Sequence, residues 1–308
     1  MKNLVYILSL LVTVSINAQL PASGVSLQSN VLDGVYIQEH IPTKRVVQYT
    51  HLREADVMWA KRIWREIDLS EKMNHKLYYP LTPLTDRMCL YDVIKYGALE
   101  EGAITVYKPE DDRFTFPVKP SNGNINDPDF KYELNKMFSK EIKIPQRDPD
   151  TGEQLTDADG NPLFNDTIEF YESRDIKKYE IKEDWFFDKQ RSVLDVRIIG
   201  ISPIVYLTEE NSETGLDEII GLKKIFWLYF PECRYTFQNF YVYNPSNDSQ
   251  KMSFDDLFWK REFSSFIKKE SNVFDRKIDG NYSGLNALLE SERIKKEMFT
   301  FEHDLWHF

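Results

Sequence analysis

One stretch of the chain and its partial echo constrain the fold more than any other feature. Asp56–Asn74 and Asp256–Asn272 can be laid on each other so that Trp59 meets Trp259. From each tryptophan, apolar residues recur four positions apart, with basic residues between them. This spacing puts the apolar residues on one face of a helix, so each stretch is predicted to be an amphipathic helix of about four turns. The short match leaves open whether it reflects a weak internal duplication of a Trp-bearing helix or chance similarity.

Four tryptophans are expected to be anchors of the structure. A tryptophan at helical spacing usually packs in a hydrophobic core, and the same large apolar surface also suits a protein interface. The residues concerned are Trp59, Trp64, Trp259 and Trp306. If Trp59 and Trp259 are core anchors, replacing either with alanine should cost about 3–5 kcal/mol. A small effect on the isolated chain, with assembly lost, would instead indicate an interface.

The first eighteen residues have the pattern of an export signal. Met1–Asn3 is a short basic start, Leu4–Val14 is largely apolar, and Ala18 offers a small residue for cleavage before Gln19. The apolar run is too short to span a membrane, and the cysteine of a lipoprotein does not follow it. We therefore expect residues 1–18 to be a signal peptide and the mature chain to lie in an extracytoplasmic space without its own anchor.

Composition indicates a folded, acidic protein. Hydrophobic residues make up 42% and aromatic residues 14% of the 308 positions, which is typical of a chain with a substantial core. A net charge of −11 gives no support to a nucleic-acid or anionic-membrane surface. The two cysteines, Cys89 and Cys233, lie in apolar segments, so we expect two buried free thiols and no disulfide framework.

The chain divides into segments of different character. The expected segments are the signal peptide at 1–18, an extended arm at 19–50, a helical and hairpin half at 51–118, a polar, turn-rich excursion at 119–170, and a sheet with C-terminal helices at 171–308. Some hairpin structure is expected within the excursion, because a long structureless loop is unusual in a compact domain. The predicted fold class is α+β, a twisted antiparallel sheet with packed amphipathic helices.

The second half supplies most of the predicted sheet. Its alternating or continuously apolar runs predict strands at 178–182, 192–207, 223–230 and 236–243. Pro203 is expected to mark a bulge or break, because proline cannot donate to a ladder. Ser253, three residues before Asp256, suits the capped start of the second Trp-bearing helix. A final helix at 284–299 is predicted, with an apolar face made by Leu285, Leu288, Leu289 and Ile294.

Known catalytic and metal-binding signatures are absent from the sequence. It contains no G-x-S-x-G, H-E-x-x-H, Walker A or dinucleotide-binding glycine motif. His303 and His307 are four apart, but they stand at the chain end with no cysteine nearby, which argues against zinc. A calcium loop over residues 155–166 fails at Leu155, where a carboxylate belongs. We therefore expect no catalytic residue, no cofactor and no metal.

Paired carboxylates keep one enzymatic alternative open. Glu183-Asp184 and Glu209-Glu210 supply the groups that a carbohydrate hydrolase uses as acid and base. Most carboxylates on an acidic chain are solvated, and no sequence pattern places either pair across a cleft. This alternative predicts a preformed pocket that holds a carboxyl with a perturbed pKa.

Several segments resemble the gliding motility protein GldN (PorN) family. The segments, which are spread over nearly the whole mature chain, are Ala55–Asn74 with Tyr78–Pro80 behind it, Pro231–Arg234, Phe254–Arg261 and Glu302–Trp306. This family is a component of the type IX secretion system of Bacteroidetes. The family has no catalytic motif, so the resemblance transfers no active-site residue.

The resemblance implies a periplasmic structural subunit. Members of this family are thought to form a large ring beneath the outer membrane with the lipoprotein GldK (PorK). The ring is thought to meet the motor proteins GldL and GldM (PorM) and to couple energy to secretion and gliding. The implied partners are GldK, GldM and further copies of the chain, with indirect outer-membrane association and no nucleic acid. The rival hypothesis is a soluble periplasmic enzyme, such as a carboxylate-dependent carbohydrate hydrolase.

Overall fold

The structure, a computed structural model, describes most of the chain. The described residues are 45–84, 87–120, 124, 126–146, 164–210, 217–247 and 250–305. The predicted signal peptide at 1–18, the predicted arm up to residue 44, and the terminal Trp306 and His307 lie outside the described residues.

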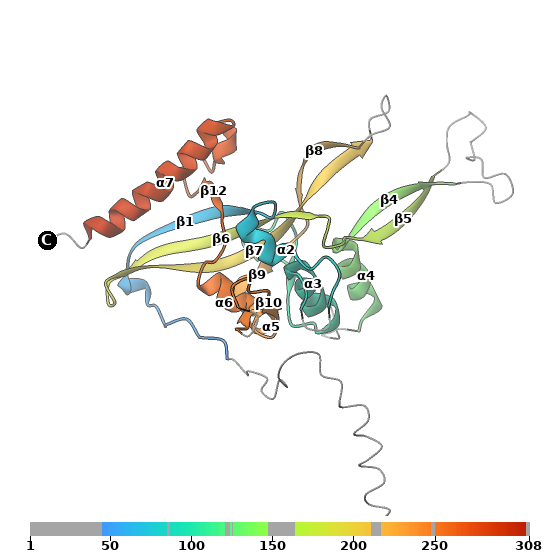
Figure 1. Cartoon of the computed structure of the whole chain (residues 1–308), viewed down its shortest axis with the longest axis horizontal. Coiled ribbons are helices and arrows are strands. Elements are labelled where there is room, and N and C mark those ends of the chain that lie inside the picture. The colour runs from blue at the N-terminus through green and yellow to red at the C-terminus, as the bar shows by residue number, and fades with distance from the viewer. Residues whose placement is uncertain are drawn as a thin grey trace, which may run out of the picture. The chain divides into compact units, whose positions relative to one another are not determined.

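A twisted antiparallel sheet carries the fold (Figure 1). Three long strands, β1 (Val57–Asp68), β6 (Ile176–Asp188) and β7 (Val193–Glu210), lie side by side in that order. Beside β1 lies β12 (Phe266–Glu270). On the far side of β7 come β9 (Trp227–Tyr229), β2 (Val106–Tyr107), β3 (Pro117–Val118) and, further along β7, β8 (Asp217–Lys224). The predicted α+β class is confirmed.

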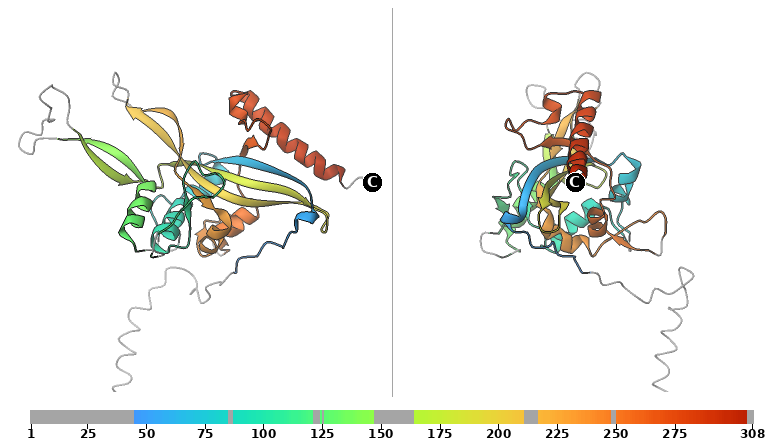
Figure 2. Two further views of the ribbon diagram at one scale, coloured as in Figure 1. Left: turned by 180° about the vertical axis from the view of Figure 1, so that it is seen from behind. Right: turned by 90° about the vertical axis from the view of Figure 1, so that its left-hand side faces the viewer.

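The helices gather in two places around this sheet. In Figures 1 and 2, α3, α5 and α6 lie together on one side of the long strands, and α7 lies apart from them. The helices are α2 (His75–Tyr78), α3 (Leu90–Lys95), α4 (Pro128–Met137), α5 (Phe230–Phe237), α6 (Phe254–Trp259) and α7 (Leu285–Asp304). Short helical turns occur at Glu54–Asp56, Lys72–Asn74, Tyr96–Glu100 and Ile278–Gly280.

The first predicted Trp-bearing helix is wrong, because Val57–Asp68 forms strand β1. Residues four apart share a face of a helix, but four is also an even number, so they share a face of a strand as well. Trp59, Ile63 and Ile67 satisfy both patterns. The positions that would distinguish a helix, three residues after the first two, are the charged Arg62 and Glu66. This segment forms a strand because its backbone pairs with β6 along the length of β1.

The echo of this stretch is helical only at its start. As predicted, Ser253 caps α6: its hydroxyl accepts from the Asp256 amide (3.1 Å), and the Asp256 carboxylate accepts from the Ser253 amide (3.2 Å). The helix ends at Trp259, because Arg261 adopts a left-handed conformation (φ 56°) and its amide bonds back to the Phe258 carbonyl. Strand β12 follows. One stretch is a strand and the other a helix followed by a strand, so they are not two copies of one helix.

The polar excursion contains the expected hairpin, formed by β4 (Ser139–Pro145) and β5 (Phe164–Phe170). Strand β7 runs through Pro203 without the break that was one of the two expectations. The other, a bulge, has a counterpart beside it, because the pairing of β6 with β7 shifts register between Lys178–Ile204 and Ile176–Val205. Pro203 lies where the neighbour of β7 changes from β9 to β8, which is a position that tolerates a residue without an N–H.

The predicted strand at 236–243 is wrong over most of its length. Helix α5 occupies Phe230–Phe237, with Pro231 in its first turn, where a proline costs no helical hydrogen bond. Only β10 (Tyr241–Val242) is extended, and it pairs with β11 (Met252–Ser253).

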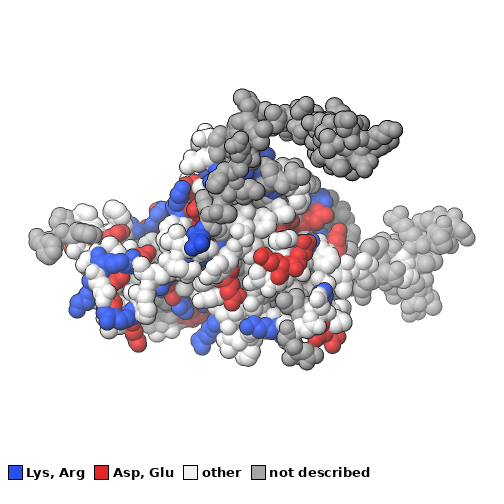
Figure 3. Space-filling model, turned by 90° about the horizontal axis from the view of Figure 1, so that it is seen from below, with Lys and Arg blue, Asp and Glu red and all other residues white. Residues whose placement is uncertain are grey.

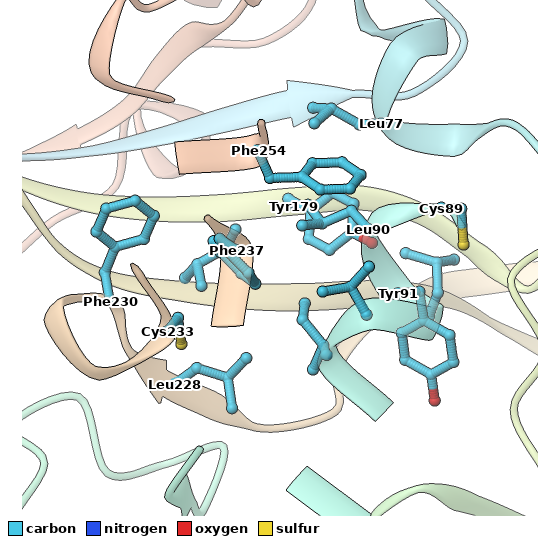
Figure 4. Packing of buried hydrophobic residues seen from close by; sticks show 14 of the residues in the cluster. Leu77, Cys89, Leu90, Tyr91, Tyr179, Leu228, Phe230, Cys233, Phe237 and Phe254 are labelled. Carbon is cyan, nitrogen blue, oxygen red and sulfur yellow. The ribbon is translucent and has the colours of Figure 1, made fainter. Parts of the chain in front are cut away.

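The main hydrophobic core fills the space between the sheet and α3, α5 and α6. Figure 4 shows Phe237 of α5, Phe254 of α6 and Leu90 of α3 around Tyr179 of β6. These side chains are almost completely buried, and together they hold the three short helices against the long strands.

The two cysteines are buried in this core as free thiols, as expected. Figure 4 places Cys89 and Cys233 on opposite sides of the cluster. Burial, together with the nearby Asp92 carboxylate, raises the pKa of Cys89 to about 12. Burial also raises the pKa of Cys233. Both thiols therefore stay protonated and unreactive at neutral pH.

The other face of the long strands carries a ladder of ion pairs. Glu66, whose neighbour Ile67 points into the core, accepts from Lys178 (2.6 Å) and Lys268 (2.7 Å). Further along, Glu180 pairs with Lys224 (2.6 Å). Burial acts to raise the pKa of Glu66, but the hydrogen bonds and charges of the two lysines lower it below its ordinary value of 4.5. The polar residues that interrupt the apolar pattern are thus paired across strands.

Replacing Glu66 with glutamine should destabilise the chain in a pH-dependent way. The pKa of Glu66 is lower in the folded than in the unfolded chain, so its contribution is present above 4.5 and is lost as the pH falls through the folded pKa. At neutral pH, Glu66→Gln should lower the free energy of unfolding by about 3 kcal/mol. The difference from the unmodified chain should shrink at pH values below 4.5 in denaturant titrations. Glu297→Gln, on an exposed part of α7, is the control and should have little effect at any pH.

Candidate interaction site

A buried carboxylate, Glu183, lies at the centre of the candidate site. On β6 it is flanked on the same strand face by Ile181, which belongs to the main core, and by Trp185, which packs toward α7. Arg65 has the corresponding place on β1, between a residue of the main core and a residue of the α7 cluster. Glu183 therefore marks the boundary between two hydrophobic clusters.

Three donors from separate elements converge on Glu183. Arg65 Nε donates to its Oε2 (3.0 Å), and Arg261 Nη2 donates to its Oε1 (2.8 Å). Trp185 Nε1 also donates to Oε2 (3.0 Å), and both guanidinium groups lie near the Trp185 ring, 5.7 and 5.5 Å from its centroid. Burial lowers the pKa of Arg65, although the Glu183 charge opposes this effect. Two cations share one buried carboxylate, so this cluster has a net positive charge.

Helix α7 is attached beside this cluster at the edge of the sheet. Its buried Ile294 and Met298 pack against Ile63 of β1 and Ile267 of β12. The Ser291 hydroxyl accepts from the Ile267 amide (2.8 Å), which ties the helix to the strand. Near the C-terminal end of the helix, the ring of Phe301 stacks on Trp59.

A groove of about 910 Å³ opens between α7 and the Glu183 cluster. Arg65, Trp185 and Arg261 contribute to its floor. Its apolar lining comes from Met73, Leu194, Phe263, Met298 and Phe299, and its charged lining on α7 from Glu292, Arg293, Lys295, Lys296 and Glu302. An apolar lining with several cations suits a protein segment with apolar and acidic side chains.

A second surface lies where the chain enters the described structure. The Tyr49 ring stacks on Trp259 at 5.4 Å between centroids, and the Arg234 guanidinium lies 4.6 Å from the Tyr49 centroid. Asp255 holds Arg234 with two hydrogen bonds, of 2.7 and 3.1 Å. Figure 3 views the molecule from the side of α5 and α6, where charges of both signs lie among wide uncharged areas. The segment at 45–50 therefore lies on its own domain through an aromatic and cationic stack.

The structure places the expected anchor tryptophans in different surroundings. Trp59 is half-buried in the α7 cluster. Trp64 is buried on the other face of β1, with Tyr107 and Trp227. Trp259 is 49% exposed beneath Tyr49, and Trp306 lies outside the described residues. The fold thus does not gather Trp59, Trp64 and Trp259 into one site.

The carboxylates named for the enzymatic alternative are held by arginines where the structure describes them. Glu183 is bound by Arg65 and Arg261, and Asp184, on the opposite strand face, accepts from Arg62 Nε (2.6 Å) and Nη2 (2.7 Å). Among the described residues, no group of three or more His, Cys, Asp or Glu side chains is arranged to hold a metal ion. Within the same residues, none of the helices has the length and apolar content needed to cross a bilayer.

The sequence analysis missed Arg65 and Arg261 as partners of Glu183. A signal was present, because Ile63-Arg65-Ile67 and Ile181-Glu183-Trp185 are alternating rows with opposite charges at their centres. Only with β1 assigned as a strand, and paired with β6, does this complementarity become visible.

Comparison with known proteins finds one family. The family model described as "Gliding motility associated protein GldN" matches residues 52–307. No curated protein matches the chain. The match covers the sheet, the Glu183 cluster and α7.

The left-handed conformation of Arg261 can be tested by comparing two substitutions. Both Arg261→Gly and Arg261→Ala remove the contact with Glu183, but only glycine adopts the positive φ without steric cost. The glycine variant should therefore be more stable than the alanine variant by about 1 kcal/mol in denaturant unfolding. Equal stabilities would contradict a strained arginine at the end of α6.

The different surroundings of the tryptophans predict unequal effects of truncation. Trp64→Ala should lower the free energy of unfolding by about 3–5 kcal/mol, because it empties a buried aromatic cluster. Trp259→Ala removes only stacking and cation–π contacts at the surface and should cost about 1 kcal/mol. Thermal and denaturant unfolding of both variants measure the difference; equal losses would show that Trp259 supports the core.

Proposed function

Because the chain belongs to the GldN family of gliding motility associated proteins, we propose that it is a non-catalytic structural subunit of the type IX secretion system. Family membership makes the chain a gliding motility and secretion-system component. The finer proposal is a periplasmic subunit that forms an outer-membrane-associated ring with the lipoprotein GldK (PorK) and further copies of itself. This ring contacts the motor proteins GldL and GldM (PorM) and passes their energy to secretion and gliding.

The family match over residues 52–307 carries this proposal. The exported, unanchored mature chain predicted from the N-terminal sequence agrees with a periplasmic subunit held at the outer membrane by a lipoprotein. The described carboxylates of the enzymatic alternative, Glu183 and Asp184, are engaged by arginines, so they support a structural role better than acid–base chemistry.

An open strand edge also supports a role in assembly. Strand β8 pairs with β7 on one side, and within the described sheet its other side has no neighbour. Its Ile219 and Ile220 side chains are 61% and 57% exposed, and Figure 1 shows the β7–β8 hairpin projecting from the body. An exposed apolar edge strand invites pairing with another chain. We assign this hairpin to the contact with another ring component.

Affinity purification from gently solubilised envelopes tests the proposal. The tagged chain should be recovered in a very large particle together with an outer-membrane lipoprotein and inner-membrane motor proteins, identified by mass spectrometry. Recovery as a small species alone, even after cross-linking, would overturn the proposed function.

A matched pair of variants tests the hairpin. Ile219→Asp together with Ile220→Asp should remove partner proteins from the particle without unfolding the chain, because a charge on an exposed edge opposes strand addition. Tyr132→Asp, on an equally exposed position of α4, should leave recovery unchanged. Full recovery with the double variant would exclude the hairpin from the contact.

A further inference from the structure

Helix α7 has two apolar faces, and only one of them is covered. The predicted single face is wrong, because Ile294 is buried against the sheet while Leu285, Leu288 and Leu289 are 70%, 50% and 58% exposed. Near the other end of the helix, Phe299 is 67% exposed. The outer face of the α7 helix therefore presents large apolar side chains to solvent along much of its length.

Helical geometry places the exposed residues on one row. Successive residues are rotated by roughly 100°, so Phe299 returns to within roughly 40° of Leu285 after fourteen positions. Ile294 is roughly 180° from Leu285, on the opposite side of the helix. We call Leu285, Leu288, Leu289, Glu292, Lys296 and Phe299 the outer row. Its last three residues also line the groove beside the Glu183 cluster, so the outer row borders that groove.

The order of apolar, acidic and basic side chains along the outer row lets two copies of the row pair with each other. Reading toward the C-terminus, leucines come first, then the acidic Glu292, then the basic Lys296, and finally Phe299. If a second α7 runs in the opposite direction, centred at the level of residue 294, Glu292 of each copy faces Lys296 of the other. The same register places Leu289 opposite Phe299. Shifting the centre to residue 292 or 296 would bring Glu292 against Glu292 or Lys296 against Lys296.

We propose that the outer row is a contact between two copies of this chain, with their α7 helices antiparallel and related by a two-fold axis. A two-fold contact uses the same patch on both subunits, so it requires a self-complementary patch, and the outer row meets this requirement. The contact packs Leu289 of each copy against Phe299 of the other and pairs Glu292 with Lys296 between them, while Leu285 and Leu288 lie farther out, opposite His303 and Thr300. Helix α7 is about 30 Å long, which is sufficient for a two-helix contact.

This contact is separate from the proposed ring. A two-fold contact closes on itself and makes pairs, whereas a ring needs a head-to-tail contact from another surface. The purified mature chain can therefore be tested alone, and its result is independent of whether the lipoprotein and motor proteins are recovered from envelopes.

Charge reversal and rescue test the proposal. The mature chain is examined by size-exclusion chromatography with light scattering and by sedimentation over a range of concentrations. The unmodified chain should form a dimer, and Glu292→Lys or Lys296→Glu alone should raise its dissociation constant at least about tenfold, because each places like charges together. The double variant, Glu292→Lys with Lys296→Glu, should restore the dimer, because it exchanges the two signs. Because Glu292 and Lys296 are also four residues apart on one helix, the free energy of unfolding of each variant is measured alongside, and a change in the dissociation constant that exceeds the change in stability identifies the contact between copies.

Glu297→Lys is the matched control. Glu297 lies next to Lys296 on the same helix and is similarly exposed, but it is outside the outer row. Its reversal should leave the dissociation constant unchanged, and circular dichroism should show that all variants keep their helix content. A mature chain that stays monomeric at its highest soluble concentration would overturn the proposal. A dimer that is insensitive to the single reversals, or that the double reversal does not restore, would overturn it as well.

Discussion

A single buried carboxylate joins parts of this chain that are far apart in sequence. Glu183 of β6 binds Arg65 of β1 and Arg261 behind α6, and it also accepts from the indole of Trp185. Removing one partner of a buried ion pair typically costs about 3–5 kcal/mol, so these interactions strongly favour one register between the strands. They also fix where the chain turns after α6. The main core lies on one side of this cluster and the α7 cluster on the other.

The two faces of the long strands are covered by different kinds of side chain. One face buries isoleucine and tyrosine side chains against short helices, and its charged interruption is the Glu183 cluster. The other face keeps its lysines and glutamates paired across strands, as Glu66 is with Lys178 and Lys268. Among the large apolar side chains that stay exposed are those on β8 and on the outer row of α7, both at the periphery of the sheet. A subunit of an assembly needs its apolar contact surface at the periphery, where a partner can bind it without disturbing the core.

Some elements could be predicted from the sequence because a local signal is sufficient to form them. Ser253 starts α6 through its own side chain, α7 has a helical apolar pattern, and the turn-rich excursion contains its hairpin. The candidate site could not be predicted in the same way. Its residues, Arg65, Glu183 and Arg261, are brought together by strand pairing and by an arginine in a conformation that usually belongs to glycine. No residue type or spacing in the sequence predicts a left-handed conformation at Arg261.

The sequence by itself determined the family, the α+β class, the burial of both cysteines and the existence of α7. These properties follow from composition, local capping and long shared motifs. Only the tertiary structure decided that Trp59, Ile63 and Ile67 belong to a strand, and that the Ile294 side of α7 is buried while the Leu285 side stays exposed. A spacing of four residues fits both a helix and a strand, and an apolar helix can be buried on either side. The physical reason is that partners distant in sequence, β6 for the strand and the β1–β12 edge for the helix, supply the free energy that selects one arrangement.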